Sequence, residues 1–307
     1  MANISPNMVK DLRDKTGAGI MDCKNALNET QGDAEAAVDW LRKKGLAKAA
    51  KKAGRVAAEG LIGLSVRGDA GALVEVNAET DFVARNDEFK DFVKRAADLG
   101  LEAGGDVEKL LSANLDGASV DETLKGLIAK IGENMSVRRA YALSVKPGVV
   151  ASYIHNASGP ELGRIGVLVA IQSEGDKDRL LALGRQIAMH IAAANPMALS
   201  VEHLPPDVVA KERDIQREIA AKSGKPDHVI EKMVEGRMKK FYEEVVLLEQ
   251  IFVIDGERRI SKVLEDASKE LGTKVEIAGF VRFAVGEGID KGDPGDFASE
   301  VKSLSGK

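Results

Sequence analysis

The stretch GLIGLSVRGDAGALVEVNA, residues 60–78, decides the fold class. Two strand-like segments flank the turn GDAG, which predicts a β-hairpin. An amphipathic helix is expected directly afterwards, because Phe89 and Phe92 belong to an apolar stripe at helical spacing. A further helix near residues 120–135 and a strand at 137–145 complete the unit. The change of period therefore predicts a sheet covered by helices.

The same order of elements recurs in the second half of the chain. GVVASYIHN and GRIGVLVAIQ predict another hairpin, and the helix DRLLALGRQIAMHIAAA follows it. A helix, RISKVLEDASKELG, and a strand, KVEIAGFVRFAV, come much later. We therefore predict an α+β fold with a core of two related halves, each an antiparallel sheet with helices over one face. The first half covers residues 55–148 and the second covers 149–205 and 249–289.

Residues 1–54 predict a small bundle of three helices followed by a linker. Ser5 and Pro6 start the first helix, and Asp33 caps the third, which we expect to end at Gly45. The following KAAKKAGR is basic and lacks an apolar face, which suits a linker or a frayed helix. Its cations could contact phosphates, but few aromatic residues lie among them, so we favour a solvated surface.

An insertion at residues 206–248 interrupts the second half. Two highly charged helical segments predict an antiparallel coiled coil, in which Val208, Ile215 and Ile219 of the first helix would face the second. The tail, residues 290–307, predicts a C-terminal module with a short helix.

Composition limits the classes of function. The 307 residues carry a formal net charge of −5, whereas a general nucleic-acid binder normally presents a basic domain. Cys23 is the single cysteine, so no intramolecular disulfide can form, which fits a reducing compartment. The first residues lack the regions of a signal peptide, and no window approaches the roughly 18 apolar residues of a membrane span. We expect a cytoplasmic protein that binds neither membrane nor nucleic acid directly.

No motif supports catalysis. Gly17 and Gly19 precede a helix, but the preceding strand and the third glycine of a dinucleotide fingerprint are missing. Cys23 lies on an apolar stripe, which favours a buried thiol over a nucleophile. The histidines lack metal-ligand spacing, and His190 is expected in the core, while His155 could contact a partner or be solvated. We expect neither a metal nor a cofactor.

The turn NAETDFVARNDEF, residues 77–89, places Phe82 among charged residues. One interpretation makes Phe82 a core residue at the end of a strand. Its position out of phase with the stripe at Phe89 supports another, an exposed aromatic anchor for a partner protein. The residues alone leave both open.

Several longer motifs of this chain resemble bacterial translation elongation factor Ts. They are TDFVARNDEF, RDKTGAGIMDCKNAL, AKKAGRVAAEG, IGENMSVRR, RIGVLVA, MHIAA, KMVEGRMKKF and GFVRFAVGEGI, and they follow the family's order over nearly the whole chain. The resemblance implies a ubiquitin-associated-like bundle, a core of two related halves, a protruding coiled coil and a C-terminal module. It also implies a guanine-nucleotide exchange factor for elongation factor Tu, without catalytic residues of its own.

The resemblance assigns partner-binding roles to particular residues. The segment Thr80, Asp81, Phe82 and Val83 would displace magnesium from the partner's nucleotide site, with Phe82 wedged between two helices of the GTPase. A complex with two copies of each protein is a further expectation.

Two other regions would contact the partner. Arg13, Ile20 and Met21 of the bundle would grip its GTPase domain, and the surface near His155 would contact its third domain. Two classes of function compete with exchange. A chaperone-like adaptor built from the bundle and the coiled coil would leave nucleotide release unaltered, and an enzyme would act through Cys23.

Overall fold

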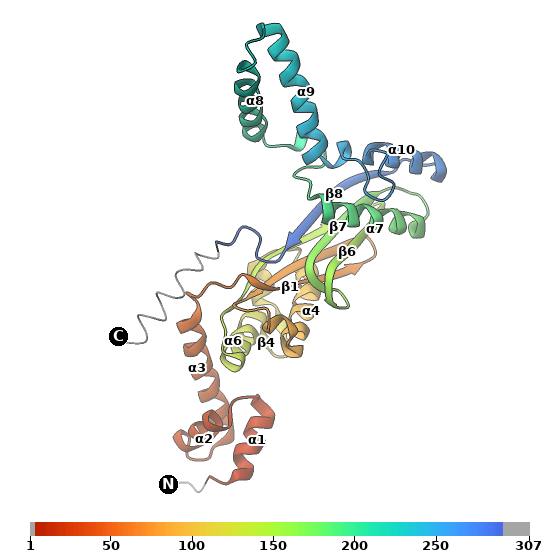
Figure 1. Cartoon of the computed structure of the whole chain (residues 1–307). Helices are drawn as coiled ribbons and strands as arrows, with labels where there is room; N and C mark the ends of the chain where they lie inside the picture. The colour runs from red at the N-terminus through yellow and green to blue at the C-terminus, as the bar shows by residue number, and fades with distance from the viewer. Residues whose placement is uncertain (1–3, 291–307) are drawn as a thin grey trace.

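The computed structural model describes residues 4–290, and Figure 1 shows them as an elongated molecule. The N-terminal helices form one end, a pair of long helices projects from the other, and the sheet lies between them. No helix within residues 4–290 is long and apolar enough to cross a membrane.

Three helices form the N-terminal bundle: α1 (Pro6–Thr16), α2 (Ile20–Glu29) and α3 (Ala34–Lys52). Ser5 caps α1, and Gly17 ends it at a φ of 64°, a conformation that favours glycine. The expected end of the third helix at Gly45 is wrong, because α3 continues to Lys52. Gly45 lies where α3 crosses α6, and a Cβ there would be 3.2 Å from that of Ala129, so packing on α6 supports the alanine-rich continuation.

Both halves of the core follow the predicted order of elements. The first half contains β1 (Glu59–Arg67), β2 (Ala70–Ala78), η1 (Val83–Arg85), α4 (Asp87–Glu102), α5 (Val107–Ser112), β3 (Asn114–Leu115), β4 (Ala118–Ser119), α6 (Val120–Ile131) and β5 (Met135–Ser144). The second half contains β6 (Gly148–Gly159), β7 (Leu162–Gln172), α7 (Lys177–Ala194), α10 (Ile260–Leu271) and β8 (Glu276–Ala284). The short α5 and the β3–β4 hairpin lie in a segment for which the sequence predicted no element.

The sequence predicted a sheet in each half, whereas the strands of both halves join in one antiparallel sheet, in the order β5-β2-β1-β7-β6, with β8 also paired to β7. The junction is short, since β1 pairs with β7 only through Ile62 and Gly63. Gly166 of β7 lies against Ile62 and Leu73, and a Cβ at Gly166 would come within 2.8 Å of both side chains. The strands of the two halves therefore pack face to face as well.

This packing gives the core a helix, strand, strand, helix layering. Leu61 of β1 belongs to the cluster under α4 and α6, whereas the neighbouring Ile62 faces the second half. Val167 of β7 likewise packs towards α7 and α10, while Leu168 joins the central cluster. Helices thus cover one face of the strands in each half, and the opposite face is buried against the other half.

A buried carboxylate links three strands. Glu75 of β2 has no solvent exposure and accepts hydrogen bonds from Arg138 (3.1 Å) and Arg139 (2.5 Å) of β5. It also accepts from the backbone N–H of Gly286, just after β8, at 2.8 Å. The end of β8 is thereby held against β2 and β5.

The projecting pair consists of α8 (Pro206–Ala221) and α9 (Asp227–Val245), flanked by η2 (Val201–His203) and η3 (Leu247–Glu249). Ala220 packs against Val234 and Met238. The predicted seam is wrong for Ile215 and Ile219, which are 41% and 44% exposed. The expected C-terminal module, residues 290–307, lies outside the described residues except for its first.

Candidate functional site

The turn between β2 and α4 is fixed at both ends by regular structure. β2 ends at Ala78, and η1 occupies Val83–Arg85. Asn86 then caps α4, because its side chain accepts a hydrogen bond from the backbone N–H of Phe89 at 3.1 Å. The intervening residues thus form a short connection with a defined path.

Phe82 lies at the outer side of this turn. Its side chain is 73% exposed, whereas the next two residues, Val83 and Ala84, are buried in the cluster beneath α4. The buried pair anchors the turn and directs the preceding ring towards solvent. The structure therefore excludes the interpretation of Phe82 as a core residue.

The charged neighbours of Phe82 are arranged around Arg85. The Arg85 guanidinium forms an ion pair with Asp81 at 3.2 Å and lies 5.8 Å from the centre of the Phe82 ring. Thr80 is half-buried and donates hydrogen bonds to Glu133. Of the four predicted residues of this segment, Asp81 and Phe82 face solvent, while Thr80 and Val83 hold the turn in place.

The predicted bundle residues also lie on the surface. Arg13 is exposed in the last turn of α1, and Ile20 and Met21 begin α2 with 57% and 65% exposure. Below them, Asp22 accepts hydrogen bonds from Lys48 (2.7 Å) and Lys44 (3.1 Å) of α3. These bonds lower the pKa of Asp22 and join α2 to α3.

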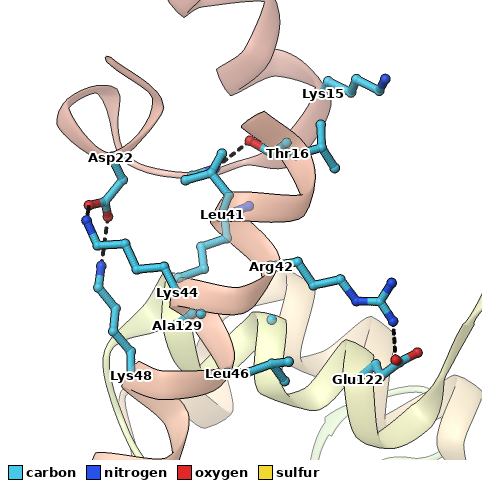
Figure 2. Close-up of a pocket in the computed structure, with 16 residues that line it drawn as sticks. Lys15, Thr16, Asp22, Leu41, Arg42, Lys44, Leu46, Lys48, Glu122 and Ala129 are labelled. Carbon is cyan, nitrogen blue, oxygen red and sulfur yellow. Dashed lines mark hydrogen bonds and ion pairs between the residues drawn. The ribbon is translucent and has the colours of Figure 1, made fainter. Parts of the chain in front are cut away.

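A hollow of about 570 Å³ separates part of the bundle from α6. Figure 2 shows Lys44 and Lys48 turned towards Asp22, and Arg42 reaching Glu122 of α6. Most of the lining cations are thus already paired with carboxylates, as is Lys130 with Glu88. The hollow is better explained as a junction held by ion pairs than as a charged pocket for a ligand.

His155 lies far along the chain, on β6 opposite Ile165 of β7. Its imidazole is exposed, with Nδ1 3.2 Å from the Tyr153 hydroxyl oxygen. Its exposure leaves the His155 side chain accessible to a partner. The contact predicted for His155 with the third domain of a partner stays a prediction.

The residues considered for catalysis are buried. Cys23 has no solvent exposure, which confirms the prediction of a core thiol. His190 is buried too, with Nε2 2.9 Å from Gln250 Oε1 and Nδ1 accepting from the Val253 N–H at 3.3 Å. Burial lowers the pKa of His190, so the ring is a neutral, hydrogen-bonded core histidine. Among residues 4–290, no group of three His, Cys, Asp or Glu side chains could hold a metal ion.

The residues that support the Phe82 turn were not among the predicted site residues. Glu79 accepts from the backbone N–H of Asn134 at 2.5 Å, and Glu133 contacts Thr80. A signal exists in the strand register, because Ala78 of β2 pairs with Met135 of β5. Continuing that register places Thr80 opposite Glu133.

Comparison with known proteins gives concordant matches. A family model described as "Elongation factor TS" matches residues 79–287, which include the Phe82 turn. The chain is 59% identical over 308 residues to elongation factor Ts of Rhodospirillum centenum, with both chains covered completely. It is 56% identical over 311 residues to that of Maricaulis maris, again covering both chains completely. Identity to the Rhodospirillum rubrum protein is 60% over 304 residues, or 98% of each chain.

Proposed function

The chain belongs to the elongation factor Ts family, and from that premise we propose that it promotes release of GDP from the GTPase elongation factor Tu. Family membership makes the protein a translation elongation factor. The exchange activity would allow GTP to bind the emptied GTPase in the cytoplasm.

The observation that carries this proposal is the exposed ring of Phe82 on an anchored turn. A large aromatic side chain held in solvent gains free energy when a partner buries it. The ring would enter an apolar gap in the GTPase and carry Asp81 towards its magnesium and phosphate site. A carboxylate is an oxygen ligand of the kind that Mg²⁺ prefers, so its approach would disturb the bound metal.

Exchange requires no catalytic group of its own, because no covalent bond is broken. A factor that binds the nucleotide-free partner more tightly than the loaded one must weaken nucleotide binding by the same ratio. Burial of one phenylalanine contributes about 1.5–3 kcal/mol, or roughly 10- to 150-fold. Contacts through Ile20, Met21 and the surface near His155 would therefore be needed to stabilise the opened partner.

Release of a fluorescent GDP analogue from elongation factor Tu tests the proposal. The release rate constant should rise with the concentration of the protein and then saturate. An unaltered release rate at concentrations where the two proteins form a complex would refute it and would favour an adaptor role.

A further inference from the structure

We propose that Glu133 is a positioning residue that orients the Phe82 turn for nucleotide exchange. The inference rests on the proposed function, because its consequence is measured on GDP release. It also assigns a role to the motif IGENM, residues 131–135, which no part of that function has yet used.

The geometry is bidentate. Glu133 Oε2 accepts a hydrogen bond from the Thr80 backbone N–H at 3.0 Å, and Oε1 accepts from the Thr80 hydroxyl at 2.8 Å. One carboxylate thus restrains both the main chain and the side chain of a residue two positions before Phe82. Hydrogen bonds to a charged acceptor are stronger than neutral ones, which suits a restraint at a half-buried position.

Strand pairing explains why Glu133 reaches Thr80. β2 and β5 are antiparallel, with Asn77 opposite Ser136 and Ala78 opposite Met135. Beyond these pairs the backbone N–H groups of Thr80 and Asn134 still donate across the two strands. Their acceptors are the side-chain carboxylates of Glu133 and Glu79 instead of backbone carbonyls. Gly132, at a φ of 92°, ends α6 and turns the chain into this register.

The segment that carries Glu133 is itself held from the other side. Asn134 donates its side-chain N–H to the Arg55 carbonyl at 2.7 Å, and Arg55 forms an ion pair with Glu79 at 3.5 Å. Lys52, at the end of α3, donates to the Gly132 carbonyl. Glu133 therefore reaches Thr80 from a fixed base rather than from a free loop.

Phe82 is consequently restrained on both sides. Thr80 is held by Glu133 before it, and Val83 is buried after it. Without the carboxylate, residues 80–82 gain conformational freedom that binding must remove again. We expect a penalty of about tenfold in the maximal rate of GDP release, which corresponds to about 1.4 kcal/mol.

The experiment measures GDP release from elongation factor Tu against the concentration of the full-length protein, for wild type, Glu133→Ala and Glu133→Gln. Glu133→Ala should lower the maximal rate about tenfold and change the half-saturating concentration less than about twofold. Glu133→Gln should fall between Glu133→Ala and wild type, because its amide retains one acceptor oxygen. The matched control is Glu102→Gln at the far end of α4, where Glu102 pairs with Arg67, and its rate should equal that of wild type.

Hydrogen exchange on the same variants separates positioning from general destabilisation. Residues 79–86 should exchange faster in Glu133→Ala, while the cores of β2 and α4 keep their protection. Equal maximal rates for wild type and Glu133→Ala would overturn the inference. So would a lowered rate with unchanged exchange at residues 79–86.

Two other outcomes of the experiment need their own tests. If Glu133→Ala does not fold, Thr80→Val replaces the hydroxyl by a methyl group and so removes one of the two hydrogen bonds to Glu133. It should lower the maximal rate about threefold, and Thr80→Ser should restore the rate. No effect of Thr80→Val would then count against positioning. If wild type itself leaves GDP release unaltered, the proposed function fails, and hydrogen exchange alone decides whether Glu133 orders the turn.

Discussion

Replacement of Phe82 by alanine tests the central contact with little risk to the fold. Phe82 is 73% exposed, and its ring makes a cation–π contact with the Arg85 guanidinium, which lies 5.8 Å from the ring centre. Surface substitutions of this kind usually change the free energy of unfolding by less than about 0.5 kcal/mol. Phe82→Ala should therefore unfold at nearly the same urea concentration as wild type, so that a change in exchange reports on the ring.

The magnitude follows from the exposed area. A phenylalanine has about 200 Å² of surface to bury, of which 73% exposure leaves roughly 150 Å². At about 25 cal/mol per Å² this area gives about 3.7 kcal/mol as an upper value, while burial of a whole side chain typically contributes about 1.5–3 kcal/mol. We expect a loss of about 2–3 kcal/mol of transition-state stabilisation, or roughly 30- to 150-fold in the rate of GDP release.

Stopped-flow release of fluorescent GDP at saturating protein measures this loss. Complex formation should be largely retained, since the bundle and the second half of the core would still bind. Met197→Ala is the matched control, because Met197 is also a large exposed apolar side chain but lies beyond α7. Release by Phe82→Ala within about twofold of wild type would refute the wedge, and an equal loss in Met197→Ala would show that the effect is not specific to the turn.

Three further predictions concern the bundle, the buried carboxylate and pH. The double replacement Ile20→Ala and Met21→Ala should weaken binding to elongation factor Tu at least tenfold by calorimetry without altering thermal unfolding, and unchanged affinity would contradict the assigned bundle contact. Glu75→Ala should lower the free energy of unfolding by about 3 kcal/mol in urea titrations, since it leaves two arginines without their buried partner, and a loss below about 1 kcal/mol would contradict that account. Burial lowers the pKa of His190, so the folded protein binds fewer protons than the unfolded chain and loses stability as the pH falls below about 6.5. Urea titrations at pH 7.5 and 5.5 should show this loss in wild type, and a loss of the same size in His190→Gln would contradict the assignment.

Local patterns were sufficient to predict most elements of the fold. The alternation in β2 and the stripe containing Phe89 act over a few residues, and the repeat of their order predicted the second half. The end of α3 could not be predicted, because the close approach of Gly45 to Ala129 of α6 is a tertiary contact that the local pattern does not contain. The exposure of Ile215 could not be predicted either, because it depends on how α8 is rotated against α9.

The candidate site shows the same division between local and tertiary causes. Sequence alone located the turn, but the direction of Phe82 depends on the burial of Val83, which requires the helix-covered face of the sheet. The contact between Thr80 and Glu133 joins residues 53 positions apart. Only the pairing of β2 with β5 brings those two side chains together.

Because α3 is uninterrupted, its length determines where the bundle lies relative to the core more than the identity of its residues does. Nineteen residues at about 1.5 Å each span roughly 28 Å, from the start of α3 inside the bundle to the contact between Lys52 and Gly132. A helix of this length fixes both the separation and the relative rotation of the bundle and the core. One residue inserted before Gly45 would rotate the bundle by about 100° around the axis of α3 relative to the core. Replacement of an alanine of α3 by another good helix former would leave the relative orientation of the bundle and the core unchanged.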